Sequence, residues 1–282
     1  SMHVSLDSAL GRQRRLNSVG ESVLQIAPNA AAAYSLRSLT GGDPKVVRVR
    51  RDTDGGAGDN DEQDFTASEV SSGALAAFVG SGNDGFVETW YDQSGNSNDA
   101  VQETAGSQPK IVNAGALLAD GIDFDGSDDT LTAASVSGFG ATISMFAASV
   151  RDSGGAAVVS MGSSASTSNT NFGIIEGSSV SNVNARNTNS VTASASVSGV
   201  TRLTFGLTTG QTSTKSGALG GTLVEDTSDY GSDFTSGELD TIFLGKLRSG
   251  SGSSFNGHIK EALIYTSDQS SNRDAIEANI AN

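Results

Sequence analysis

The sequence predicts an all-β sandwich with a few short helices and an N-terminal arm. From residue 86 onward, short apolar runs alternate with clusters of Gly, Ser, Asn and Asp, a pattern typical of strands joined by tight turns. The chain holds 35 glycines but only 3 prolines, which argues against a Pro-rich linker. Its 282 residues suit one large all-β domain.

The N-terminal residues differ from the rest of the chain. Leucines are spaced among polar residues there, and Arg12, Arg14 and Arg15 form a basic cluster. The pattern is compatible with an extended or partly helical assembly arm, and equally with a frayed terminus. We therefore divide the chain into an arm at 1–28 and a sandwich domain at 29–282.

The segment before the main β region is predicted to mix helices with one strand. Asn29 is a suitable cap for a short helix over 30–39. Alternating apolar and basic residues predict a strand over 45–51. An acidic loop follows at 52–64, and residues 66–80 are predicted to form another short helix.

The rest of the chain is predicted to be strands, closed by a helix over 270–282. Many short strands without intervening helices favour a sandwich over alternating β/α units. The predicted strands cover 86–92, 109–112, 121–126, 130–134, 142–151, 156–162, 171–177, 201–209, 221–226, 240–247 and 257–267.

The net charge of −15 excludes several classes of partner. The phosphates of nucleic acid and anionic membrane surfaces would be repelled, whereas neutral glycans are compatible. No segment reaches the ~20 apolar residues of a membrane span, so we expect neither nucleic-acid binding nor membrane insertion. The absence of cysteine excludes disulfides and fits assembly in a reducing cytoplasm.

Two acidic stretches carry carboxylates at a spacing compatible with Ca²⁺, which takes six to eight oxygen ligands. Asp52 and Asp54 begin the first, which lacks the glutamate that an EF-hand has at its twelfth position. Asp123 and Asp125 begin the second, "DFDGSDD". A solvated loop paired with neighbouring arginines and a β-turn are the favoured alternatives. We expect no cofactor, with Ca²⁺ as the compatible exception.

The single tryptophan stands in the most informative stretch, "ETWYDQSGNSND". Two aromatic rings followed by carboxylates and amides could present a flat face and hydrogen-bonding groups to a sugar. The alternative, which the residues favour, places the two rings on opposite faces of a strand, with one ring in the core and the polar residues in a turn network. The candidate glycan-binding residues of this stretch are Trp90, Tyr91, Asp92, Gln93, Asn96 and Asn98.

Hydrolysis of a glycosidic bond needs two carboxyl groups that flank the bond, ~5 Å apart for retention or ~6.5–9.5 Å apart for inversion. Spacing along the chain does not pair the acids of the β region. A Ser/His/Asp triad is not indicated, because His258 is accompanied by no Gly-x-Ser-x-Gly motif. The acids considered are Glu88, Asp92, Asp99, Glu176, Glu225, Asp226, Asp240 and Glu261.

Several segments together resemble the catalytic domain of the α-L-arabinofuranosidase B family. They are "VVRVRRDTD", "VETWYDQSGNSNDAVQ", "QPKIV" and "FNGHIKEALIYTSDQSSNRDAIEANI". The family's Tyr-Asp-Gln-Ser-Gly-x-x-Asn-Asp element matches Tyr91–Asp99. The same segments resemble a group of phage tail and appendage proteins, and "FDGSDD" is similar to a turn of laminin-G-like domains. The resemblance implies a concanavalin-like jelly-roll β-sandwich over most of 29–282.

The resemblance also implies where catalytic residues would lie, and the sequence departs from the family at both places. The stretch matching the nucleophilic glutamate has no carboxylate between Val180 and Val200. The stretch matching the acid/base aspartate contains Arg248 but no acid. Glu176 is the mid-domain acid that a shifted alignment would make the nucleophile. Otherwise the matched segments would form a scaffold or a degenerate sugar cleft that includes Arg248.

The resulting hypothesis is a non-catalytic domain of a phage virion, in a tail fibre, spike or appendage, assembled in the host cytoplasm. It would bind a host cell-surface glycan or other virion proteins. We expect a homo-oligomer such as a trimer, because several copies raise the avidity of a weak binder. The alternative is a glycoside hydrolase of the arabinofuranosidase type that acts on polysaccharide.

Overall fold

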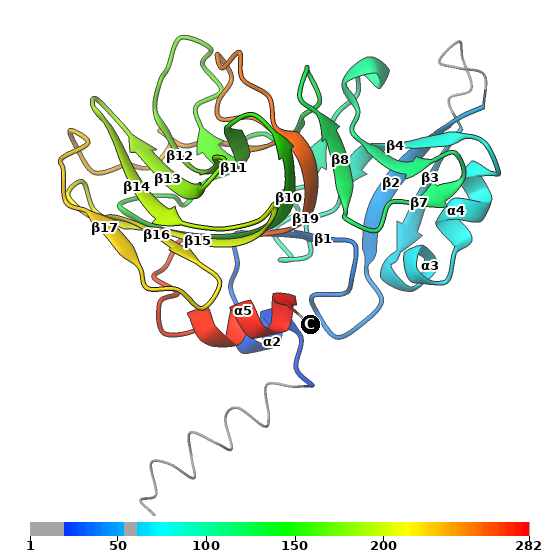
Figure 1. Ribbon diagram of the computed structural model, residues 1–282, viewed down its shortest axis with the longest axis horizontal. Helices are drawn as coiled ribbons and strands as arrows, with labels where there is room; N and C mark the ends of the chain where they lie inside the picture. The colour runs from blue at the N-terminus through cyan, green and yellow to red at the C-terminus, as the bar shows by residue number, and fades with distance from the viewer. Residues whose placement is uncertain (1–19, 54–60, 282) are drawn as a thin grey trace, which may run out of the picture.

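A computed structural model describes residues 20–53 and 61–281 as two layers of antiparallel strands with a few short helices (Figure 1). The predicted β-sandwich is thereby confirmed. The first layer is centred on the long strand β19, whose one edge pairs with β10 and whose other edge pairs with β8 and then β1. Beyond β10 the layer continues through β15 and β16 to β17. These strands are β1 (Ala32–Ser35), β8 (Ile122–Asp125), β10 (Thr142–Ser153), β15 (Thr201–Thr209), β16 (Thr214–Ala218), β17 (Val224–Asp226) and β19 (Asn256–Tyr265).

The second layer runs in the order β14–β13–β12–β11–β18–β9–β5–β4–β2–β3. Strand β6 pairs with β4, β7 and β8, so it joins the two layers at one side. The bounds are β2 (Lys45–Asp52), β3 (Glu62–Thr66), β4 (Asp84–Trp90), β5 (Ala100–Val101), β6 (Lys110–Asn113), β7 (Ala116–Leu117), β9 (Leu131–Ala133), β11 (Ala156–Gly162), β12 (Asn171–Glu176), β13 (Val180–Arg186), β14 (Ser190–Ser196) and β18 (Thr241–Leu244).

Alternation along the strands creates two apolar cores. In β10, Met145 and Ala147 face the first core, between the layers, whereas Phe146 faces the other way. Phe146 belongs to a second core on the outer face of β10 and β15, where its ring lies 4.7 Å from that of Phe205. Helices α2 (Val23–Ile26) and α5 (Arg273–Ala281) cover this second core, and Figure 1 shows them together beneath the curved sheet.

The packed domain begins before the predicted boundary at residue 28. Val23 and Ala27 are buried in the second core, and the Asn279 side chain donates to the carbonyl of Glu21. The rest of the predicted arm, 1–19, lies outside the described residues.

The predicted helix over 30–39 is wrong, because its centre is strand β1. Ala32 to Ser35 pair in register with β19, and all four residues are buried. The alanine-rich composition favours a helix, but the main-chain bonds to β19 and burial on both faces outweigh that preference. The predicted helix over 66–80 is two helices, α3 (Ala67–Ser71) and α4 (Ala74–Val79), separated by Gly73 at φ +91.

The other predicted elements are largely confirmed. The predicted strands correspond to observed ones, and the closing helix is α5. A further short helix, η1 (Ala105–Ser107), precedes β6. The sequence analysis missed β3, β5, β7, β13, β14 and β16. Strands β13 and β14 carry polar residues between small apolar ones. None of the described helices is long and apolar enough to cross a membrane.

Candidate functional site

The tryptophan of the "ETWYDQSGNSND" stretch lies in the first core. Trp90 has no exposed surface, and its ring packs against that of Tyr34 at a centroid distance of 5.9 Å. The neighbouring Tyr91 is half-buried on the other face of the strand, where its hydroxyl donates to Asp64 at 2.7 Å. Burial is the main cause that raises the pKa of the Tyr91 hydroxyl. Trp90 therefore offers no face to a sugar, as the core alternative predicts.

The polar residues of the same stretch form hydrogen bonds to the main chain of strand β1 and of the residues next to it, and we call these bonds the β1 brace. The carboxylate of Asp92 accepts from the main-chain N–H of Ala33 at 2.8 Å and from that of Ser94 at 2.8 Å. Gln93 is buried and bonds the main chain at Ser35, Arg37 and Leu39.

Asn96 and Asn98 lie at the end of the same brace. Their side-chain amides donate to the carbonyls of Ala30 and Ala31. Together with Ser94 and Ser135 they line a polar hollow of about 570 Å³. Arg248, the remaining candidate, packs against Gly162 of β11. The stretch is thus a structural turn network, of which Ser94, Asn96 and Asn98 border a hollow.

Glu176, the candidate nucleophile, is sealed inside the sandwich. Its side chain has no exposed surface and accepts from the hydroxyls of Ser181 and Thr204, each at 2.7 Å. Arg202 lies beside it, with 3.6 Å between Nε and Oε2. Burial raises the pKa of Glu176, although both hydroxyls and the arginine oppose that shift. A sugar has no access to this carboxyl group.

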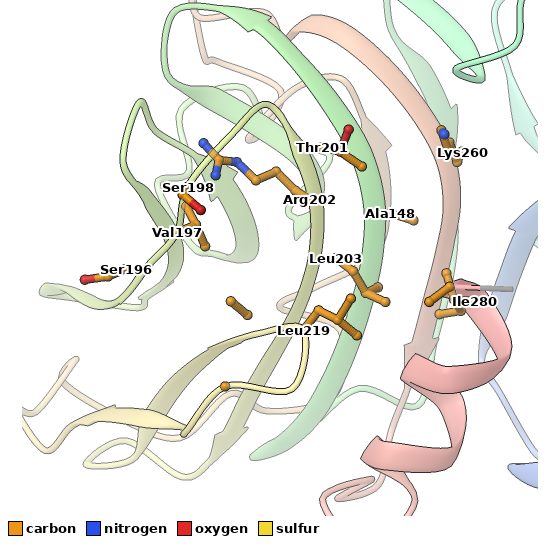
Figure 2. A pocket seen from close by; sticks show the side chains of 13 residues that line it. Ala148, Ser196, Val197, Ser198, Thr201, Arg202, Leu203, Leu219, Lys260 and Ile280 are labelled. Carbon is orange, nitrogen blue, oxygen red and sulfur yellow. The ribbon is translucent and has the colours of Figure 1, made fainter.

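The hollow nearest to this pair, of about 560 Å³, opens on the outer face of the sheet (Figure 2). Leu203, Leu219 and Ile280 form an apolar floor, and the Arg202 guanidinium points away from it toward Ser198. Arg202 also lines this hollow, although its side chain is only 1% exposed and its Nε lies 3.6 Å from the Glu176 carboxylate.

A row of charged and aromatic side chains crosses five neighbouring strands on the face turned away from the first core. The register pairs Arg50 of β2 with Phe86 of β4, Phe86 with Lys110 of β6, Lys110 with Asp123 of β8, and Asp123 with His258 of β19. Directly paired residues point to the same face of a sheet. We call this row the cross-strand ladder. With strands ~4.8 Å apart, it spans about 19 Å.

Four members of the ladder, Arg50, Phe86, Lys110 and Asp123, line a cleft of about 450 Å³, and His258 lies beyond its end. The Phe86 ring is flanked by two cations, with Arg50 at 4.9 Å and Lys110 at 5.7 Å from its centroid. The guanidinium of Arg50 is held by a 2.8 Å hydrogen bond to the buried Gln108. The cleft therefore combines an apolar ring with fixed hydrogen-bonding groups, the composition of many small-ligand sites.

Carboxyl groups stand on both sides of this floor. Asp52 comes from β2, whereas Asp123 and Asp125 come from β8 and Asp129 from the turn that follows it. Asp129 is buried and accepts from the main-chain N–H of Asp125 at 3.0 Å. Burial is the main cause that raises the pKa of Asp129 to about 6, and the charge of Asp125 adds to the rise.

The predicted metal candidates fall into separate places. Asp54 lies outside the described residues, and Asp52 lines the cleft from β2. Asp125 groups with Asp128 and Asp129, with carboxylate oxygens within 4.8 Å of one another. Asp123 instead faces His258 across the strand pair.

Sequence reasoning missed the ladder as a site. Each of its members stands in or next to a predicted strand, but they come together only through the order β2–β4–β6–β8–β19, which the sequence did not predict. The raised pKa of Asp129 likewise depends on burial of a turn that reads as exposed in the sequence.

Comparison with known proteins adds structural likeness only. No family model matches the chain, and no curated protein matches it by sequence. Among solved structures, a mutant of a glycoside hydrolase family 54 α-L-arabinofuranosidase soaked with 4-nitrophenyl α-L-arabinofuranoside is 15% identical, with a TM-score of 0.62, over 89% of this chain and 63% of that chain. An arabinofuranosidase complexed with arabinofuranosyl-α-1,2-xylobiose is 13% identical, with a TM-score of 0.58, over 89% of this chain and 62% of that chain.

The chain has the fold of these arabinofuranosidases. It spans less than two thirds of their length. These matches overturn the main hypothesis of a non-catalytic phage virion domain, because the matched structures that cover 89% of the chain and are named here are arabinofuranosidases. At 13–15% identity the likeness establishes the shared fold, and the hydrolase alternative becomes the hypothesis to test.

Proposed function

We propose that this chain is a glycoside hydrolase domain that cleaves a furanoside linkage in a neutral polysaccharide, in the cleft above the cross-strand ladder. The observation that carries the proposal is the set of carboxyl groups around an aromatic floor in that cleft, formed by Asp123, Asp125, Asp129 and Phe86. The fold shared with arabinofuranosidases supports the class of reaction.

Asp129 is the proposed proton donor to the leaving-group oxygen. Its pKa of about 6 keeps a useful share of the carboxyl group protonated near neutral pH, as a general acid requires. Asp125, which is exposed in the same cleft, is the proposed second carboxylate. One oxygen of each group lies within 4.8 Å of the other, which is compatible with the short separation of retaining enzymes, ~5 Å, and not with the ~6.5–9.5 Å of inverting ones.

The floor of the cleft would position the sugar. Phe86 supplies apolar surface, and Arg50 and Lys110 supply donors for hydroxyl groups. The four ladder residues that line the cleft span about 14 Å at ~4.8 Å per strand, which is enough for a short oligosaccharide.

Release of 4-nitrophenol from 4-nitrophenyl α-L-arabinofuranoside tests the proposal directly. Asp129→Asn and Asp125→Asn are each expected to lower kcat/KM by about 10²-fold or more. Asp128→Asn, in the same turn but hydrogen-bonded to Ser107, is the matched control and should stay within a few-fold of the wild type. The rate should fall as pH rises above about 6, because Asp129 must be protonated.

Two outcomes would contradict the proposal. One is turnover that both cleft variants leave intact and that Glu176→Gln abolishes, since that would return the reaction to the sealed acid. The other is binding of an arabinan oligosaccharide, measured by calorimetry, without turnover of any furanoside. That result would support a glycan-binding domain and contradict a hydrolase.

A further inference from the structure

Three strands that are distant in sequence bring one imidazole and two carboxylates together at one end of the ladder. Asp123 of β8 and His258 of β19 are directly paired. Asp152 belongs to β10, on the other side of β19, where the register skips one residue between Arg151 and Ser153. Asp152 is therefore the extra residue of a β-bulge, a device that re-aims a side chain.

The backbone of β19 is adapted to this bulge. Gly257 has φ +148, and a Cβ there would lie 2.2 Å from the carbonyl oxygen of Val150. Only glycine allows β19 to approach β10 so closely beside His258.

The distances within the trio do not suit hydrogen bonds. His258 Nε2 lies 3.9 Å from Asp123 Oδ1 and 3.7 Å from Asp152 Oδ2, beyond the usual range for an N–H···O bond. Two ligands of a tetrahedral Zn²⁺, each ~2.1 Å from the metal, stand ~3.4 Å apart. A contraction of a few tenths of an ångström would therefore bring each carboxylate oxygen to the ligand–ligand distance from Nε2, and the three ligand atoms already lie within 4.8 Å of one another.

We propose that Asp123, Asp152 and His258 bind a first-row divalent metal ion, with Zn²⁺ as the preferred occupant. One nitrogen and two carboxylate oxygens suit Zn²⁺, whereas Ca²⁺ and Mg²⁺ prefer an all-oxygen set with more ligands. Three protein ligands leave a coordination position for water or for a sugar hydroxyl. Asp123 also lines the cleft, so the ion would border the place where a glycan is proposed to bind.

The trio is accessible to an ion from solvent. The side chains of Asp123 and Asp152 are 33% and 50% exposed, and that of His258 is 17% exposed. The ring's other nitrogen, Nδ1, is buried without a hydrogen-bond partner among the described residues, which leaves Nε2 as the accessible metal ligand. The carboxylate cluster at Asp125, Asp128 and Asp129 lacks an imidazole and serves as an internal comparison.

Calorimetric titration of ZnCl₂ into the EDTA-treated full chain at neutral pH tests the proposal. All variants carry His3→Ala, which removes the only other histidine. We expect one Zn²⁺ per chain, and a loss of affinity of about tenfold or more in both His258→Gln and Asp152→Asn. Asp128→Asn should bind as the background protein does.

The same titration with CaCl₂ should give no binding that His258→Gln alters. Absence of Zn²⁺ binding by a folded chain, or Zn²⁺ binding that His258→Gln and Asp152→Asn leave unchanged, would overturn the proposal. The readout is equilibrium binding without turnover, so its failure leaves the proposed hydrolase function untouched.

Discussion

Arg202 and Glu176 form a buried ion pair inside the sandwich, with 3.6 Å between Nε and Oε2 and side chains that are 1% and 0% exposed. The guanidinium also donates to the carbonyls of Gly177 and Ser178, so one arginine holds the turn that follows β12. Because neither charge reaches solvent, the pair acts on stability and not on a ligand.

Glu176→Ala is expected to lower the free energy of unfolding by about 3–5 kcal/mol, because it leaves the Arg202 charge buried without its partner. Urea unfolding measures the loss. The matched control is Glu225→Ala, which removes the exposed partner of Lys215 and should cost less than about 1 kcal/mol. Equal effects of the two substitutions would contradict the assignment of a buried pair.

Asp129 is expected to make the folded state less stable as pH rises. Its pKa is about 6 in the folded state against an ordinary value of 3.8, so the folded chain holds this proton more tightly than the unfolded chain. The stabilisation is complete below about pH 4 and is lost as pH rises through about 6, up to a limit of about 3 kcal/mol. In Asp129→Asn this loss should disappear from the pH profile of urea unfolding. If the free energy of unfolding depends on pH in the same way in the wild type and in Asp129→Asn, the raised pKa of Asp129 would be refuted.

Trp90 is expected to affect the stability of the fold and not the binding of a sugar. Trp90→Ala should cost about 3–5 kcal/mol by leaving a large cavity in the first core. Trp90→Phe should cost much less, because the indole N–H has no hydrogen-bond partner among the described residues. The tryptophan fluorescence of the wild type should be that of a buried indole and should not shift when an oligosaccharide is added. If the fluorescence shifts when sugar is added, and shifts equally in the Asp129→Asn variant, the result would contradict burial of the Trp90 ring.

Asp92 is expected to contribute strongly to the stability of the fold. Asp92→Ala removes the acceptor for the N–H groups of Ala33, Ser94 and Asn98, and should lower the free energy of unfolding by about 3 kcal/mol or more. The control is Asp268→Ala, whose carboxylate accepts from Ser270 two residues away and from no other described residue, and which should cost less than about 1 kcal/mol. Thermal unfolding of both variants gives the comparison.

Local sequence patterns predicted a strand correctly where the residues that form the pattern are also the ones buried in the core. The apolar runs at 142–151 and 257–267 predicted two central strands of the first layer, and the turn network predicted around Asp92 and Gln93 is observed as the hydrogen bonds that hold β1. The segment 30–39 failed because alanine propensity is local, whereas its pairing with β19 joins residues more than 200 positions apart. The ladder was missed for the same reason, since its members meet only through the order of strands.

The hydrogen bond from Asn279 to Glu21 ties α5 to the segment before α2, so the first and last described residues leave the domain from one place. A short peptide could join these two points without crossing the sandwich, and the chain could then be reopened at an exposed turn such as the one at Gly199. The fold thus has a topology suited to circular permutation, in which order along the chain changes while every layer keeps its neighbours.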